Sequence, residues 1–279
     1  MKIVVGILLV LALVILGLAT LRFLDRRADQ AEWKRLETFQ PDEPTLFSDK
    51  MVAHLPEPAR RYFTYAIRLD TPLLPVTVIE MQGQFSLGAK DDPGYKPMEA
   101  HQILAAPEGF VWAMRTRGGM PLSGSDSSRW TRFRILGLIP VARFGSDADH
   151  TRSAFGRYVA EAVIWAPAAL LPRPDVTWTS VDDDTARVTI HHGDLSQAVD
   201  VTVDGAGRPV VVAFQRWTNA NSDKEYRLQR FGAITSDFRE VGGYRLPFHV
   251  EAGNMFGTDD YFPFFLAEVT KIWFPGHKL

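Results

Sequence analysis

The stretch AVDVTVDGAGRPVVVAFQRW, residues 198–217, decides the fold class. The valines between positions 199 and 203 alternate with polar residues, which is the pattern of a strand with one buried face. The glycine-rich segment 204–207 predicts a tight turn, and the valine-rich run at 209–217 predicts a second strand. Strands joined by so short a turn pair antiparallel, so the stretch predicts a hairpin of an antiparallel sheet.

Segments of the same kind recur on both sides of this hairpin. We predict further strands at 76–87, 98–106, 109–115, 127–135, 176–181, 186–191, 226–240, 244–251 and 264–274. The glycine- and serine-rich segment 117–128 indicates a flexible loop. An apolar stripe at helical spacing predicts a helix at 152–165, and a sheet with one apolar face must bury that face against such an element. The fold class is therefore α+β, a large curved antiparallel sheet (a half-barrel) with one or two helices in its concave face.

An uncharged apolar run from Ile3 to Leu21 precedes this domain. At about 1.5 Å per residue a helix over the run is about 28 Å long, enough to cross a hydrocarbon core of about 30 Å. The run exceeds the apolar core of about 7–15 residues of a signal peptide, and Arg22 follows it directly. These features favour an uncleaved transmembrane helix, with signal-peptide cleavage after Ala19 as the alternative.

The charges around the run leave the orientation open. Arg22, Arg26 and Arg27 follow it, whereas only Lys2 precedes it, and the positive-inside rule alone places the domain in the cytoplasm. Large domains, however, translocate largely regardless of flanking charge. Because a single N-terminal helix before a strand-rich domain is typical of exported proteins, we expect a single-pass protein of the bacterial cytoplasmic membrane. Its domain is expected on the outer, periplasmic or extracellular, side.

The composition excludes several function classes. The chain of 279 residues has no cysteine, which excludes zinc ribbons, iron–sulfur clusters and thiol catalysis. Its formal net charge is −2, and several of its basic residues lie beside the membrane segment, so we expect no nucleic-acid partner. Phosphate-binding, nucleophile-elbow and zinc-protease motifs are missing from the sequence. We expect no cofactor and no metal ion, and we assign no catalytic residue.

Prolines divide the chain before the domain. Pro41 and Pro44 stop any helix and predict a linker. We expect a transmembrane anchor at 1–23, a juxtamembrane stalk and linker at 24–50, and a single β-rich domain at 51–279. A domain of about 230 residues can bury one large core.

The predicted long helix carries one unusual constellation. Arg157, Glu161 and Trp165 follow one another at intervals of four, so they share a face and place a carboxylate between a guanidinium and an indole. If that face meets the sheet, the ion pair either fixes the helix structurally or belongs to a ligand site. We predict a ligand cavity between helix and sheet whose candidate residues are Trp112, Arg115, Phe155, Arg157, Val159, Glu161, Trp165 and Leu170.

Several sequence blocks also carry a family resemblance. The chain resembles an uncharacterised bacterial membrane-anchored family, a domain of unknown function, over about 55–274. The blocks are LPEPARRY (55–62), GFVWAMR (109–115), GRYVAE (156–161), WAPAALLP (165–172), GYRLP (243–247) and YFPF (261–264). The strand count and single long helix are also similar, at the level of fold, to lipoprotein-carrier (LolA/LolB-like) half-barrels, a resemblance that implies an acyl-chain cavity.

These observations predict a membrane-anchored envelope protein that contacts the membrane through residues 3–21 and binds a lipid or other hydrophobic ligand. The first alternative is a scaffold or accessory subunit of a membrane complex, whose protein partner the sequence does not name. The second is a carboxylate-dependent enzyme that uses Glu161. We favour a function without catalysis.

Overall fold

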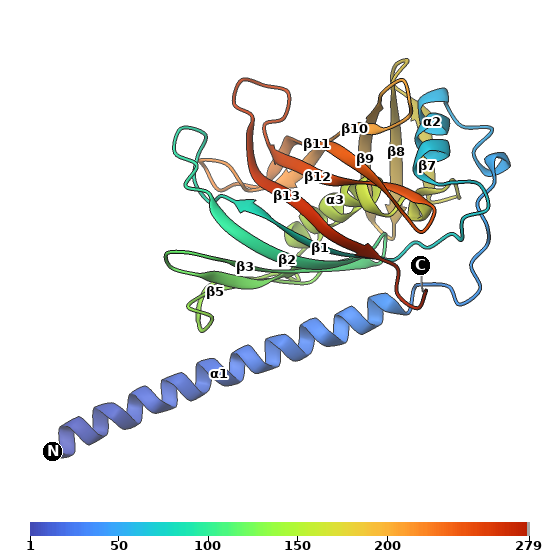
Figure 1. Ribbon diagram of the computed structural model, residues 1–279. Coiled ribbons are helices and arrows are strands. Elements are labelled where there is room, and N and C mark those ends of the chain that lie inside the picture. The colour runs from blue at the N-terminus through green and yellow to red at the C-terminus, as the bar shows by residue number, and fades with distance from the viewer. Residues whose placement is uncertain (278–279) are drawn as a thin grey trace.

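The computed structural model describes residues 1–277 and shows one sheet of 13 antiparallel strands curved around a helix (Figure 1). The predicted α+β half-barrel is confirmed. The helices are α1 (Lys2–Glu37), α2 (Glu57–Ala66) and α3 (Ala148–Trp165), with short 3-10 turns η1 (Asp49–Met51) and η2 (Pro167–Leu170). The strands are β1 (Thr77–Phe85), β2 (Lys96–Ala105), β3 (Gly109–Thr116), β4 (Leu122–Ser127), β5 (Thr131–Ile135), β6 (Ile139–Phe144), β7 (Val176–Ser180), β8 (Thr185–His192), β9 (Leu195–Val203), β10 (Pro209–Thr218), β11 (Arg227–Val241), β12 (Tyr244–Asn254) and β13 (Phe262–Trp273).

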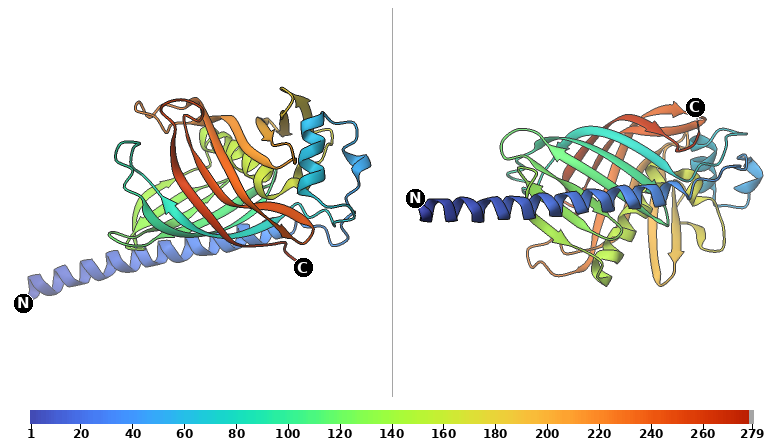
Figure 2. Two further views of the ribbon diagram at one scale, coloured as in Figure 1. Left: turned by 45° about the horizontal axis from the view of Figure 1, so that its top comes forward. Right: turned by 90° about the horizontal axis from the view of Figure 1, so that it is seen from below.

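The strand order explains why a helix must lie inside the sheet. Across the sheet the strands run β6-β5-β4-β3-β2-β1-β13-β12-β11-β10-β9-β8-β7. The first six strands therefore extend to one edge, and the next strand begins at the opposite edge. The chain returns between these edges through α3 and η2, which cross the concave face (Figure 2).

Side-chain hydrogen bonds fix α3 to the elements around it. At its C-terminal end the Thr77 hydroxyl donates to the carbonyl of Trp165 at 2.9 Å, and the Tyr62 hydroxyl of α2 donates to the carbonyl of Val163 at 2.8 Å. A Cβ atom on Gly156 would lie only 2.7 Å from Oε1 of Gln197, so the absence of a side chain lets α3 approach β9 closely. These contacts set the spacing of helix and sheet.

Helix α1 lies along the outside of the same sheet (Figures 1 and 2). It is long and apolar enough in its first part to cross a membrane, a property that signal sequences share. Beyond Leu21 the same helix continues to Glu37, so the segment expected as a stalk starts as helix. Leu36 is fully buried there against Val78, Ile103 and Val111, the outward-facing apolar residues of β1 to β3.

A charged residue of α1 is also buried. The Asp25 side chain is 6% exposed and is bound by three arginines of the β5–β6 hairpin. It lies 2.6 Å from Nη1 of Arg143 and 3.2 Å from Nη1 of Arg132, and it also pairs with Arg134. We call these four residues the Asp25 clasp.

Two strands differ from the sequence-based expectation. The segment 117–128 was expected as a loop but contains β4, and β6 was not expected at all. Strand β4 is rich in serine and glycine, which favour turns, yet its backbone pairs with β3 and β5 on both sides. Strand β6 exposes Ile139 and Val141 at the sheet edge, so its apolar residues do not mark a buried face.

Candidate functional site

A cavity of about 240 Å³ lies between α3 and the concave face of the sheet. Most of its wall is aromatic or aliphatic. The aromatic side chains in the wall are Phe85, Trp112, Phe133, Trp165, Phe214, Phe231, Phe264 and Phe265. Ala160 of α3 and Ala233 and Ala252 of the sheet leave the space open, because larger side chains at these positions would fill it.

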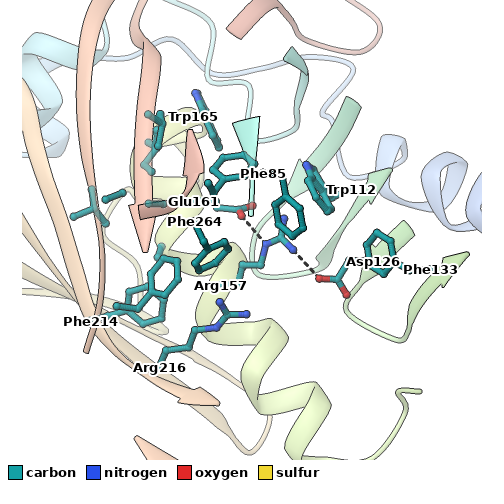
Figure 3. A pocket seen from close by; sticks show the side chains of 18 residues that line it. Phe85, Trp112, Asp126, Phe133, Arg157, Glu161, Trp165, Phe214, Arg216 and Phe264 are labelled. Carbon is teal, nitrogen blue, oxygen red and sulfur yellow. Dashed lines mark hydrogen bonds and ion pairs between the residues drawn. The ribbon is translucent and has the colours of Figure 1, made fainter. Parts of the chain in front are cut away.

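A charged cluster forms the polar part of the wall (Figure 3). Arg157 donates from Nε to Glu161 at 2.7 Å and from Nη1 to Asp126 of β4 at 2.6 Å. Burial opposes the charge of Arg157, but the two carboxylates outweigh it and hold the Arg157 pKa above its ordinary value. The guanidinium also lies 5.0 Å from the ring centre of Trp112, within cation–π range.

Glu161 has no free carboxylate oxygen. Its Oε1 accepts from Arg157, and its Oε2 accepts from the side-chain amide of Gln102 at 2.6 Å. A general base needs an oxygen within reach of a substrate proton. Each oxygen of Glu161 already accepts one hydrogen bond in this structure, as in an ion pair that fixes α3 to the sheet.

Arg216 of β10 is the other charged residue of the cavity wall, and its bonding differs. Within residues 1–277 it forms no ion pair with a carboxylate, and its buried Nε has no hydrogen-bond partner. Its guanidinium lies 5.1 Å from the ring centre of Phe231. Burial and repulsion by Arg157 lower the Arg216 pKa to about 10, so the side chain remains charged at neutral pH.

The structure divides the eight predicted site residues into three groups. Trp112, Arg157, Glu161 and Trp165 meet at the cavity. Trp165 is 2% exposed and donates from its indole to the carbonyl of Pro247 at 3.2 Å.

The remaining four residues do not line this cavity. Phe155, Val159 and Leu170 are buried in the hydrophobic core beside it. Arg115 lies on the convex side of the sheet, where it pairs with Glu99 at 2.5 Å, so it is remote from any ligand in the cavity.

Two polar residues of the cavity were missed in the sequence. Arg216 continues the inward-facing series of Val212 and Phe214, and strand alternation could have placed it on the buried face. Asp126 had no such indication, because its strand was read as a loop. Within the described part of the chain, no group of histidine, aspartate and glutamate side chains is arranged to hold a metal ion.

Three comparisons with known proteins were made. A crystal structure of a LolA superfamily protein from Nitrosomonas europaea is similar, with 12% sequence identity, a TM-score of 0.37, and coverage of 80% of this chain and 93% of that chain. No curated protein matches the sequence. The model of a family of unknown function, DUF6544, matches residues 45–267. The predicted resemblance is confirmed, and the chain belongs to this family of unknown function.

Proposed function

We propose that this chain is a single-pass membrane protein of the bacterial envelope that binds a lipid or other hydrophobic ligand between α3 and the sheet. The observation that carries the proposal is the cavity itself. A concave site lined mostly by aromatic and aliphatic side chains, with a few charged groups at one side, is the usual form of a site for a small hydrophobic ligand.

The size of the cavity limits the ligand. Sites for drug-sized molecules have volumes of about 300–1,000 Å³. The observed volume of about 240 Å³ suits one slender apolar chain rather than a bulky molecule. A chain drawn from a bilayer fits this requirement.

The alternatives have less support. A scaffold would need no unfilled space between helix and sheet. An enzyme using Glu161 would need a free carboxylate oxygen, and both oxygens of Glu161 already accept hydrogen bonds.

The membrane part of the proposal rests on α1. We propose that residues 3–21 cross the cytoplasmic membrane and that the domain lies on its outer side. The bound chain would then lie within a short distance of the lipid surface.

The test is native mass spectrometry of the full-length protein extracted in a lipid-preserving polymer, followed by organic extraction of the bound molecules. We expect a co-purifying hydrophobic molecule in the wild type and less of it in Ala233→Phe, which fills the cavity. Ala113→Phe on the convex face is the matched control and should retain the molecule. The ligand proposal fails if nothing co-purifies and no apolar probe binds, and the intact mass shows whether residues 1–19 remain attached.

A further inference from the structure

The charged side chains of the cavity wall differ in whether they have a partner of opposite charge. Arg157 occupies one oxygen of Glu161 and one of Asp126, and Gln102 takes the other oxygen of Glu161. The second oxygen of Asp126 accepts from the Thr131 hydroxyl at 2.6 Å. Both carboxylates are therefore committed, and neither pairs with Arg216 in the described residues.

The half-buried Arg216 side chain has no carboxylate within ion-pair distance in the described residues, although Asp126 and Glu161 attract its charge from farther away. Removing an arginine from water without a partner is unfavourable, and the lowered pKa of Arg216 expresses this penalty. An anion placed in the cavity would supply the missing acceptor in a water-poor environment, where charge-assisted hydrogen bonds are strong. Figure 3 shows the Arg216 guanidinium turned toward the space beside Arg157.

The apolar wall defines the other part of the ligand. Phe214 precedes Arg216 by two residues on the same face of β10, and Phe231 stacks beneath its guanidinium. The cation therefore stands at the border of an aromatic surface. We propose that Arg216 binds the head group of the cavity's ligand, a slender apolar chain that ends in one anionic group, a carboxylate or a phosphate monoester. This inference rests on the proposed function, because it names the chemistry of the ligand of the same cavity.

The test compares two probes of equal chain length, 11-bromoundecanoate and 11-bromoundecanol, on the full-length protein in lipid nanodiscs. Bromine quenches tryptophan fluorescence on contact, and Trp112 and Trp165 line the cavity. We expect the carboxylate to bind at least about tenfold more tightly than the alcohol. Arg216→Gln should reduce this preference to less than about twofold, whereas Arg230→Gln on the adjacent strand, an exposed arginine, should not change it.

Each outcome separates the two proposals. If both probes bind equally to the wild type, the anionic head group is rejected and the hydrophobic ligand stands. If neither probe binds, the proposed function itself fails. If undecyl phosphate binds no better than inorganic phosphate alone, Arg216 is an anion site without a chain, which also rejects this inference. Because Arg216 carries an unfavourable buried charge, Arg216→Gln should unfold at no lower temperature than the wild type, so lost binding would not reflect misfolding.

An independent set of contacts concerns the level at which α1 leaves the membrane. The β5–β6 turn lies beside Arg22, since a Cβ atom on Gly137 would be 2.9 Å from Nη1 of that arginine. The β3–β4 loop adjoins this turn, because the amide of Leu136 donates to the carbonyl of Pro121 at 3.0 Å. Both hairpin tips therefore lie where the apolar run ends.

These tips carry exposed apolar side chains at that level. Leu136 is 60% exposed and Met120 is 55% exposed. Apolar side chains beside the arginines that follow a membrane helix match the chemistry of a lipid interface, whose acyl boundary accepts the former and whose phosphates accept the latter. We infer that the β3–β4 and β5–β6 tips insert into the membrane interface beside α1, an inference that rests on the proposed membrane anchoring.

The chain has no cysteine, so single cysteines can be introduced without background. Met120→Cys and Leu136→Cys, labelled with bimane, are reconstituted as full-length protein in vesicles containing lipids brominated near the head group. Quenching should be at least about twice that of Asp183→Cys, an exposed position in the turn between β7 and β8. Equal quenching at all three positions rejects the contact. Release of the protein by an alkaline carbonate wash would instead reject the membrane anchoring.

Discussion

Replacing Arg157 by methionine is expected to lower the free energy of unfolding by about 3 kcal/mol, because Asp126 and Glu161 would lose the guanidinium that hydrogen-bonds to both of them in a largely buried site. Removing one partner of a buried ion pair costs about 3–5 kcal/mol. The three side chains retain 17–19% exposure, which favours the lower end of that range. For a domain of this size the loss corresponds to about 6–12 °C in the unfolding temperature, measured by differential scanning fluorimetry.

Two variants in the same cavity make this prediction specific. Glu161→Gln keeps an acceptor for Arg157 and leaves Asp126 in place, so its loss should be only about 1 kcal/mol. Arg216→Met removes a charge that forms no ion pair in the described residues and that Arg157 repels, so its unfolding temperature should stay the same or rise. Equal losses for Arg157→Met and Arg216→Met would show that the assignment of the two arginines, one structural and one facing a ligand, is wrong.

The local pattern of apolar and polar residues was sufficient to predict much of the sheet and the inward face of α3. The alternation of Val199, Val201 and Val203 predicts the buried face of β9, and all three are at most 2% exposed. The helical spacing of Arg157 and Glu161 predicts the ion pair that is observed at 2.7 Å. In these elements the periodicity of the sequence and the geometry of burial coincide.

Other features depend on partners far along the chain. Strand β4 exists because β3 and β5 hydrogen-bond to it, although its own residues favour turns. In the sequence Asp25 lies among Arg22, Arg26 and Arg27 and has no evident partner farther along the chain. In the structure it pairs with Arg143, which is 118 residues away. A single sequence gives no indication of such pairs, because neither residue type nor spacing relates them.

The cavity contains one feature that local pattern predicts and one that depends on distant partners. Arg216 lies two residues after Phe214 on a face that alternation predicts as buried, so an arginine on the inward face was detectable before the structure. Its lack of an ion pair in the described residues was not detectable, since that depends on how Arg157 distributes its hydrogen bonds between Asp126 and Glu161. The burial of a residue can thus be predicted from the alternation within one strand. Whether a buried charge has a partner depends on all the elements that form the site.

The second large effect is expected outside the cavity, at the Asp25 clasp. Asp25→Asn leaves Arg132, Arg134 and Arg143 close together without their shared carboxylate, so repulsion replaces attraction. Arg134 is 8% exposed, but Arg143 is 42% exposed and partly screened by water. We therefore expect a loss of about 3 kcal/mol, with Asp42→Asn, an exposed aspartate of the linker, as the control without effect.

The same variant tests whether α1 and the sheet form one rigid unit. The apolar cluster between α1 and the sheet includes Leu36, buried among Val78, Ile103 and Val111, but none of residues 22–30. Losing the clasp should therefore free the part of α1 next to the apolar run and leave its C-terminal end attached. A spin label at Ala28→Cys should become more mobile in Asp25→Asn, while a label at Thr38→Cys should not change. Unchanged mobility at both positions, together with unchanged stability, would show that the clasp does not hold the helix. A mobile result would mean that the Asp25 clasp holds this part of α1 against the sheet and that the neighbouring hydrogen bond, from the Ser125 hydroxyl to Asp29 at 2.8 Å, does not hold it alone.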